Sequence, residues 1–283
     1  HGLVIVDKPS GVTSHDVVSV LRKQLGERRI GHAGTLDPDA TGVLLVGVGY
    51  VTRLLTFLSG LDKTYTAQIV LGSATSTLDS SGTVTATHDM SSITVDEVQR
   101  VVKENFVGKI SQVPPMVSAL KVDGVRPHEL ARQGIEVERA ARELTIHGFE
   151  VFGMSEPGVV DVEVHCSSGT YIRSLADDLG RALGGSAHLR NLRRISVGGF
   201  LQSECSQLDD VIVHPPITAV RTMSRVVADE QMQTMIKHGR EIEKFDSPAP
   251  WVLVDEQNAV LAVYELSPTG RAKPSVVMAN AVA

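Results

Sequence analysis

The sequence predicts an α/β protein of the α+β type that ends in a small all-β module. Alternating apolar residues indicate strands at 63–71 and 159–166, and apolar residues at helical spacing indicate a helix at 171–183. Near the C-terminus a short helical piece is followed by three strand candidates separated by turn signals. Hydrophobic residues form 42% of the 283 residues, enough for a large core. We therefore expect a main domain, residues 1–222, and a C-terminal module, residues 223–283.

The first elements are expected to be a strand, a helix and a second strand joined by glycine-rich turns. Leu3–Val6 is strand-like, and a turn-rich stretch follows that ends at Ser14. We expect Ser14 to cap a helix that stops at Gly26. The stretch Gly31–Gly42 follows neither hydrophobic period and is full of turn formers, so we expect a long ordered loop before a strand at Val43–Val48.

Residues 73–142, between two predicted strands, are expected to form an insertion. Its first part, 73–92, is polar and rich in Ser and Thr. Thr94 and Glu97 then have the spacing of a capping box at the start of a helix. The remainder carries mixed charges, a Pro-Pro pair and a possible short helix at Pro127–Arg132, which favours a hairpin arm.

Composition narrows the classes of function. No apolar run is long enough to span a bilayer, and the chain opens on strand-like residues rather than on a signal peptide. Of the two cysteines, Cys166 alternates in phase with three valines, so we expect it to be buried, and neither cysteine has metal-site spacing. We expect a cytoplasmic protein that does not bind membranes.

A formal net charge of -6 argues against a protein that coats nucleic acid indiscriminately, but it leaves room for a local basic face. Each of two basic clusters suits either such a face or an ordinary solvated surface. The clusters are Arg22, Lys23, Arg28 and Arg29, and Arg181, Arg190, Arg193 and Arg194.

The stretch Gly31–Gly42 holds the residues best suited to chemistry, since it combines His32 and Asp37 with glycines that let a large ligand approach. An aspartate before proline suits a turn as well as a catalyst. Arg173 lies in the first turn of its predicted helix, where the helix dipole disfavours a cation unless an anion is near. The alternative is a surface pair with Asp177, worth about 0.3–0.5 kcal/mol. Residue chemistry alone does not decide whether Asp37 is a turn residue or a catalyst, or whether Arg173 binds an anion in the site or pairs with Asp177.

Five motifs, in the same order along roughly residues 2–200, resemble those of the bacterial tRNA pseudouridine-55 synthases, the TruB family. They are KPSGVTS at Lys8–Ser14, GHAGTLDPDATG at Gly31–Gly42, KTY at Lys63–Tyr65, QVPPMVSALK at Gln112–Lys121 and CSSGTYIRSLADDLG at Cys166–Gly180. The resemblance implies a pseudouridine synthase fold, with a mixed, largely antiparallel sheet flanked by helices. It also implies an RNA-gripping insertion and a small C-terminal module of the PUA type.

The resemblance implies a catalytic group of three residues. Asp37 matches the catalytic carboxylate, and Arg173 matches the arginine that pairs with it. Tyr65 matches the tyrosine that stacks on the target base and is proposed to take part in proton abstraction. The reaction breaks the bond from N1 of uracil to the ribose C1′ and re-forms it through C5, so we expect no metal and no cofactor.

The resemblance also implies residues that bind the substrate. His32 matches a histidine that enters the RNA stack, Tyr171 and Leu192 match pocket residues, and Lys8 belongs to a motif packed beside the site. The implied partner is the T-arm of tRNA, with uridine 55 as the target. We expect a monomer that acts without a guide RNA.

Three alternatives compete with a stand-alone pseudouridine synthase. A tRNA-folding chaperone would use the same cleft without chemistry. A guide-dependent synthase is disfavoured by the long insertion and the short C-terminal module. A dinucleotide-dependent oxidoreductase would use the glycines of Gly47–Thr52, but Thr52 stands where the third glycine of that fingerprint is needed.

Overall fold

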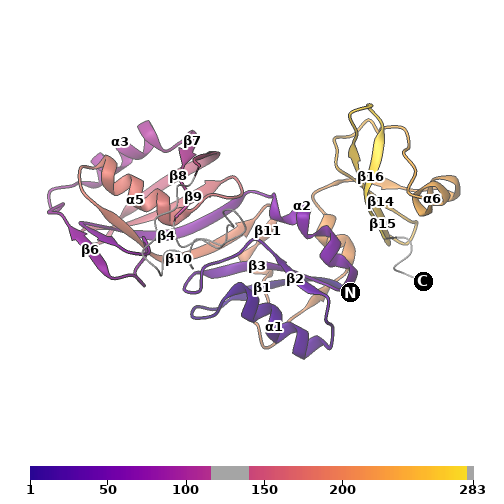
Figure 1. Cartoon of the computed structure of the whole chain (residues 1–283), viewed down its shortest axis with the longest axis horizontal. Coiled ribbons are helices and arrows are strands. Elements are labelled where there is room, and N and C mark those ends of the chain that lie inside the picture. The colour runs from indigo at the N-terminus through magenta and orange to yellow at the C-terminus, as the bar shows by residue number, and fades with distance from the viewer. Residues whose placement is uncertain (116–139, 279–283) are drawn as a thin grey trace.

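The computed structural model describes residues 1–115 and 140–278, and its centre is a ten-stranded sheet (Figure 1). The sheet contains β1 (Gly2–Lys8), β2 (Ile30–Ala33), β3 (Thr41–Val48), β4 (Lys63–Leu71), β7 (Gly108–Gln112), β8 (Arg142–Glu156), β9 (Val159–Cys166), β10 (Ala187–Val197), β11 (Phe200–Leu201) and β12 (Val213–His214). The strand order is β12-β1-β3-β10-β4-β9-β8-β7, with β2 paired to β3 and β11 paired to β10. β10 runs parallel to β3, and the other pairings in this sheet are antiparallel. The mixed, largely antiparallel sheet is confirmed.

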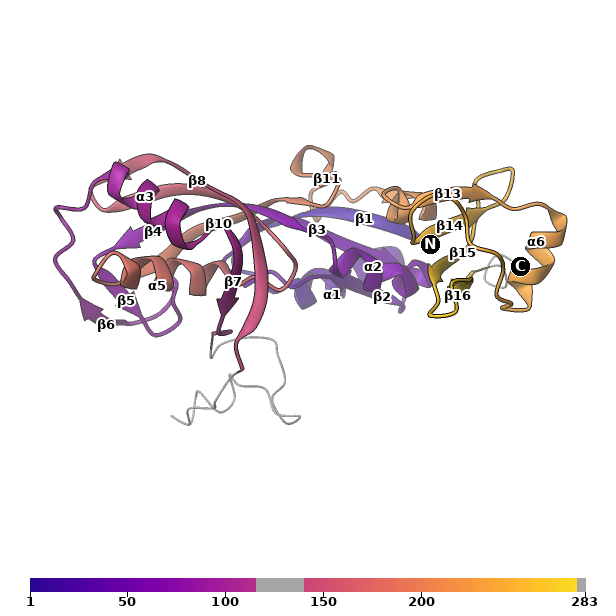
Figure 2. The ribbon, with the colours of Figure 1, turned by 90° about the horizontal axis from the view of Figure 1, so that it is seen from above.

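Helices cover the two halves of the sheet separately (Figure 2). α3 (Val95–Asn105) and α5 (Ile172–Ala182) lie over the half that contains β4, β8, β9 and β10. Val98 of α3 and Leu175 of α5 share one core with Ile69 and Val162. Cys166 is buried in the same core, as its alternation with the valines predicts.

The other half of the sheet packs against α1 (Ser14–Leu25) on one face. Val17 and Leu21 of this helix contact the core formed by Val4 and Leu44. The opposite face, with Leu3 and Ile5 of β1, packs with η1 (Gly49–Leu54) and α2 (Leu55–Ser59). No helix within the described residues is long and apolar enough to cross a bilayer.

Ser14 does not cap α1, so that prediction is wrong. Thr13 is the N-cap: its hydroxyl accepts from the Asp16 backbone NH at 3.0 Å, and the Asp16 carboxylate accepts from the Thr13 NH at 2.8 Å. Ser14 is instead the first helical residue and is buried. The helix ends at Gly26 in a left-handed conformation, as predicted.

The loop predicted at Gly31–Gly42 is shorter than expected, because both of its ends belong to strands. Gly31, His32 and Ala33 lie on β2, which pairs with β3, and β3 itself begins at Thr41. The polar stretch 73–92 also contains two short paired strands, β5 (Ser73–Thr75) and β6 (Val84–Thr87). Glycines and hydroxyl residues obscured these strands, whose stability comes from the ladder rather than from their own composition.

The second basic cluster does not form one basic surface. Three of its arginines lie on β10, a strand absent from the predicted elements, and their side chains serve separate partners. Arg190 pairs with Glu156 and Arg193 with Asp7, both at 2.8 Å, whereas Arg194 is buried. The fourth, Arg181, pairs with Asp177 on α5 at 2.7 Å.

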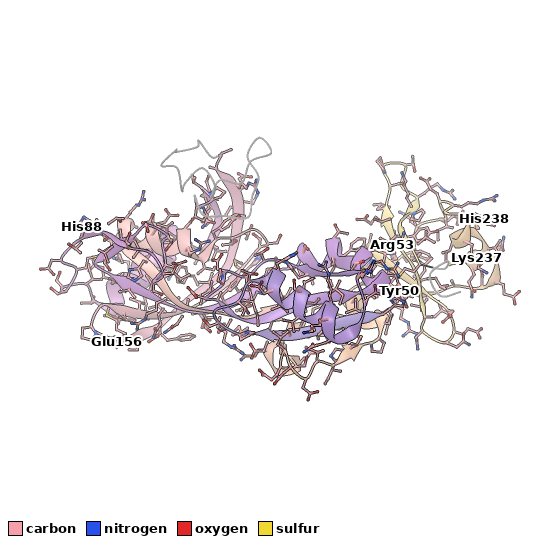
Figure 3. The ribbon with its side chains drawn as sticks, turned by 60° about the horizontal axis from the view of Figure 1, so that its bottom comes forward. Tyr50, Arg53, His88, Glu156, Lys237 and His238 are labelled. Carbon is pink, nitrogen blue, oxygen red and sulfur yellow. The ribbon has the colours of Figure 1, made fainter. Side chains whose placement is uncertain are left out.

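The C-terminal sheet has four strands, one more than predicted. The order is β13 (Ser224–Val227), β14 (Trp251–Val254), β15 (Val260–Leu266) and β16 (Ala272–Val277), and α6 (Glu230–Lys237) accompanies them. Val252 and Val263 join the apolar cluster of η1 and α2, and Arg53 donates to the Val277 carbonyl at 2.7 Å. Figure 3 shows Tyr50 and Arg53 beside this module. The boundary at 222/223 and the insertion at 73–142 remain predictions, and the helix predicted at Pro127–Arg132 lies outside the described residues.

Candidate active site

A cavity of about 270 Å³ opens where the loop after β2 meets β4, β10 and the N-terminus of α5. Five of the predicted site residues line it or reach it, and Lys8 and His32 do not. Its lining residues are Gly34, Thr35, Leu36, Asp37, Ser59, Lys63, Tyr65, Gly169, Thr170, Tyr171, Ile172, Arg173, Leu192 and Arg194. The site therefore unites segments that are far apart in the sequence.

Asp37 and Arg173 form an ion pair in the wall of this cavity. Arg173 Nε lies 2.8 Å from Asp37 Oδ2, and Nη2 donates to Asp37 Oδ1 at 3.1 Å. The Asp37 side chain is 39% exposed, whereas that of Arg173 is 5% exposed. The surface pair between Arg173 and Asp177 is not formed. The arrangement presents an accessible carboxylate oriented by a buried guanidinium, which is a geometry suited to nucleophilic chemistry.

Two further groups lie close to the Arg173 guanidinium. Nη1 donates to the Thr77 carbonyl at 3.0 Å, and Nε lies 3.7 Å from the Asp79 carboxylate. Sequence reasoning missed both residues, because they lie in a polar stretch that carries no sign of a role. Asp79 accepts from the hydroxyls of Thr77 and Ser81, each at 2.6 Å, which fixes its orientation.

The loop that carries Asp37 is attached to the first segment of the chain. Ser14, which is 1% exposed, accepts from the Leu36 NH at 2.9 Å and donates to the Leu36 carbonyl at 3.2 Å. Lys8 Nζ donates to the Pro38 carbonyl at 2.9 Å, and also to the carbonyls of Pro9 and Val12. The two residues on either side of Asp37 are therefore fixed through their backbones.

Lys8 is not among the residues that line the cavity. Burial lowers the pKa of its ammonium to about 8, although Asp39 and Asp37 act in the opposite direction. Its three carbonyl acceptors give it a structural task in the Lys8–Ser14 motif. The implied contact of Lys8 with substrate stays a prediction, and the geometry favours positioning of the loop.

Ser14→Ala is expected to lower kcat while tRNA affinity changes little. The variant leaves a buried NH and carbonyl of Leu36 without partners, which costs about 1–3 kcal/mol in the free energy of unfolding and loosens the loop. Ser19→Ala, on the exposed face of the same helix, is the matched control. Denaturant unfolding and single-turnover kinetics measure the two effects. A Ser14→Ala protein with the kcat of wild type would show that Leu36 needs no such anchor.

Tyr65 lies on β4 in the cavity wall and is almost completely buried. Burial raises the pKa of its phenol, whereas the nearby charge of Arg194 lowers it. Lys63, two residues earlier, donates to the carbonyls of Ser59 and Leu61, and burial lowers its pKa to about 8. Lys63 was part of a recognised motif, but only the structure places it in the cavity.

Tyr171 and Leu192 reach the same cavity from α5 and β10. Tyr171 precedes α5, and the Gln112 side chain bonds both its NH and its carbonyl, at 2.9 and 3.1 Å. Leu192 lies in a bulge of β10 after Asn191, whose φ is 54°. The positions of both residues agree with pocket roles, which remain predictions.

His32 lies on β2 and does not line the cavity, although Gly34, two residues later, does. Its Nδ1 is buried and has no hydrogen-bond partner among the described residues. Burial and the charges of Arg194 and His15 lower the pKa of His32, which favours the neutral ring. An uncharged aromatic ring at the edge of the site is compatible with stacking on a base.

A second cavity of about 400 Å³ lies on the other side of the Asp37–Arg173 pair. It shares Asp37, Arg173 and Leu192 with the first cavity. Hydroxyl and acidic residues dominate the rest of its lining, among them Ser10, Asp39, Thr77, Asp79, Ser80 and Ser81. The ion pair therefore borders both cavities.

Two family models match the chain. The model described as TruB family pseudouridylate synthase (N terminal domain) matches residues 22–172, and that described as tRNA pseudouridylate synthase B C-terminal domain matches residues 173–215. Both end before β13, so they do not describe the C-terminal sheet, and its PUA-like character stays a prediction.

Relatives match along nearly the whole length. The chain is 45% identical over 289 residues to the tRNA pseudouridine synthase B of Rhodococcus jostii (strain RHA1), with 98% of this chain and 93% of the relative covered. It is 43% identical over 293 residues to that of Thermobifida fusca (strain YX), with 99% of each covered. Among solved structures, the Cbf5-Nop10-Gar1 complex contains a chain with a TM-score of 0.73 and 26% identity, covering 97% of this chain and 83% of the other.

Proposed function

Because the chain belongs to the TruB family of pseudouridylate synthases, we propose that it isomerises a uridine in the T-arm of tRNA, expected at position 55, with Asp37 as the catalytic carboxylate. The class of the enzyme is that of an isomerase that makes pseudouridine in RNA. The relatives' names support tRNA as the substrate. The observation that carries the proposed role of Asp37 is its exposed carboxylate, paired with buried Arg173 in a cavity.

The proposed chemistry needs only groups that the cavity contains. A carboxylate can attack C1′ of the ribose, attack C6 of the ring, or assist loss of uracil to form a glycal. In each route Arg173 orients the carboxylate and balances its charge. After rotation and reattachment through C5, the C5 proton must leave, and Tyr65 is the group in the cavity that would receive it.

Access of the uridine requires extrusion of its base. A stacked base in a folded loop cannot reach Asp37, and flipping it out costs a few kcal/mol, which contacts at the gap must offset. The position of His32 at the edge of the site supports its proposed role as the residue that fills this gap. Tyr171 and Leu192 are proposed to contact the extruded base.

His32→Ala is expected to reduce kcat/KM on full tRNA by about tenfold or more, because loss of a stacked ring removes about 1–3 kcal/mol per base. His165→Ala, which changes an exposed histidine on β9, is the matched control. Steady-state kinetics on an intact tRNA transcript measure the effect. Equal kcat/KM values for His32→Ala and wild type would contradict the proposed role of His32 in filling the gap.

A tRNA-folding chaperone would have no use for a paired carboxylate in its binding cavity. The Asp37–Arg173 pair therefore favours the enzyme, although one protein can have both activities. Stand-alone action is favoured because relatives named tRNA pseudouridine synthase B match 98–99% of the chain. The neighbouring solved structure, Cbf5, is in complex with Nop10 and Gar1. Action as a monomer in the cytoplasm also belongs to the proposal.

Mapping of the product tests the target position. The protein is incubated with a tRNA transcript, and pseudouridine is located by carbodiimide treatment and primer extension. We expect one stop, at uridine 55, and none on a transcript with cytidine at that position. Pseudouridine elsewhere would contradict the T-arm assignment, and tight binding without any pseudouridine would favour the chaperone.

A further inference from the structure

Arg194 differs from the other arginines of its strand because its charge has no carboxylate partner. Its side chain is 1% exposed and is among the largest fully buried side chains of the protein. Arg190 and Arg193 on the same strand pair with Glu156 and Asp7. Among residues 1–115 and 140–278, no carboxylate lies within 4.0 Å of the Arg194 guanidinium. Buried charges are normally paired, so this cation calls for a functional explanation.

The hydrogen bonds of Arg194 go to neutral backbone carbonyls on two segments of the chain. Nε donates to the Val43 carbonyl at 2.7 Å, and Nη2 donates to the Gly34 carbonyl at 3.2 Å. Arg194 and Tyr65 both line the cavity. Arg194 stands opposite Tyr65 in the pairing of β10 with β4. It thus bonds the loop that carries Asp37 and lies beside Tyr65 in the sheet.

The positive charge of Arg194 acts on the groups around it. It lowers the pKa of His32, Lys8 and Lys63, and it opposes the rise in the Tyr65 pKa that burial causes. Two other titratable groups near Tyr65, Cys166 on β9 and Asp37, both raise its pKa and so oppose Arg194. The cations Lys63 and Arg173 also belong to the cavity lining.

We propose that Arg194 is a positioning residue for the isomerisation, which orients the Tyr65 hydroxyl and stabilises negative charge on its oxygen. A guanidinium has donors and no acceptor, so in this role Arg194 donates to the phenol oxygen and the Tyr65 O–H points into the cavity. Without the cation, burial keeps the phenol protonated, so little phenolate is present to accept a proton. The inference rests on the proposed function and extends it to a residue outside the five motifs.

The proton transfer balances as follows. After C5 is bonded to C1′, the phenolate oxygen of Tyr65 takes the C5 proton. The electron pair of the C5–H bond forms the C5=C6 double bond, the C6=N1 pair moves to N1, and N1 takes a proton from water. The neutral Tyr65 then returns its proton to solvent. Arg194 exchanges no proton, because a guanidinium stays charged throughout.

A double-mutant cycle with a pH profile tests this role. Arg194→Met is expected to slow single-turnover isomerisation by about 10²-fold, with tRNA affinity within about tenfold of wild type. The ascending limb of its pH–rate profile should move to higher pH, since loss of the cation raises the Tyr65 pKa further. Arg194→Lys keeps the charge and should keep the position of the limb.

Arg194→Met should add no further loss in a Tyr65→Phe protein, because Arg194 acts through the phenol. The inference would be overturned if the rate losses of the two single variants multiplied in the double variant. It would also be overturned if the ascending limb of the pH–rate profile of Arg194→Met stayed at the wild-type position. If Arg194→Met does not fold, Arg194→Gln, which also removes the charge, gives the same cycle in the wild-type and Tyr65→Phe proteins. Arg193→Lys, whose side chain pairs with Asp7, is the control. Wild-type protein without isomerase activity would instead refute the proposed function.

Discussion

Asp37→Asn is expected to abolish turnover while tRNA affinity stays within about tenfold of wild type. An amide is neither a nucleophile nor a base, so none of the three routes remains open. The affinity for a folded RNA comes largely from phosphate contacts spread over a wide surface, to which one side chain contributes little. Single-turnover kinetics and filter binding separate the two quantities.

Asp209→Asn makes the same chemical change at an exposed position far from the cavity lining, and it should behave as wild type. Measurable turnover by Asp37→Asn would show that another group performs the nucleophilic step. A loss of tRNA affinity equal to the loss of turnover would instead make Asp37 a binding residue.

Arg173→Met is expected to lower kcat by about 10²-fold or more, because a small displacement of a reacting group has an effect of this size. The variant removes both contacts to the Asp37 carboxylate and the bond to the Thr77 carbonyl. Arg173→Lys should recover only part of the rate, since an ammonium cannot hold two oxygens in a planar fork.

The matched control for Arg173 is Arg181→Met on the same helix, which loses only the pair with Asp177. Thermal unfolding verifies that Arg173→Met is folded. A folded Arg173→Met protein with a kcat within a few-fold of wild type would show that Asp37 is positioned without the guanidinium.

Hydrophobic periodicity predicted the strands that alternate regularly. Tyr65, Ala67 and Ile69 face the core as their spacing requires, and β4 and β9 have the predicted bounds. β10 was missed because bulges at Asn191 and before Ser196 break its alternation. These irregularities also place Leu192 and Arg194 in the cavity, so the features that hid the strand help to form the site.

The candidate site shows a similar limit. Residue chemistry indicates Asp37 and Arg173 only singly, and their pairing follows from the family resemblance. They lie 136 residues apart in the sequence, and the fold brings their side chains together. Ser14 has a residue type that suits an N-cap. Its side chain is buried instead, and its hydroxyl forms hydrogen bonds with the backbone of Leu36. Asp79 lies in a polar stretch without hydrophobic period, and nothing in its local sequence indicates that it faces Arg173.

Release of tritium from a tRNA transcript labelled at uracil C5 tests the central claim most directly. Wild-type protein, without added metal or cofactor and with a chelator present, is incubated with the transcript beside Asp37→Asn. We predict that wild type releases one equivalent of label per target uridine to water and that Asp37→Asn releases none. Release by both proteins would contradict the role of Asp37, and release by neither, despite tight tRNA binding, would contradict isomerisation itself.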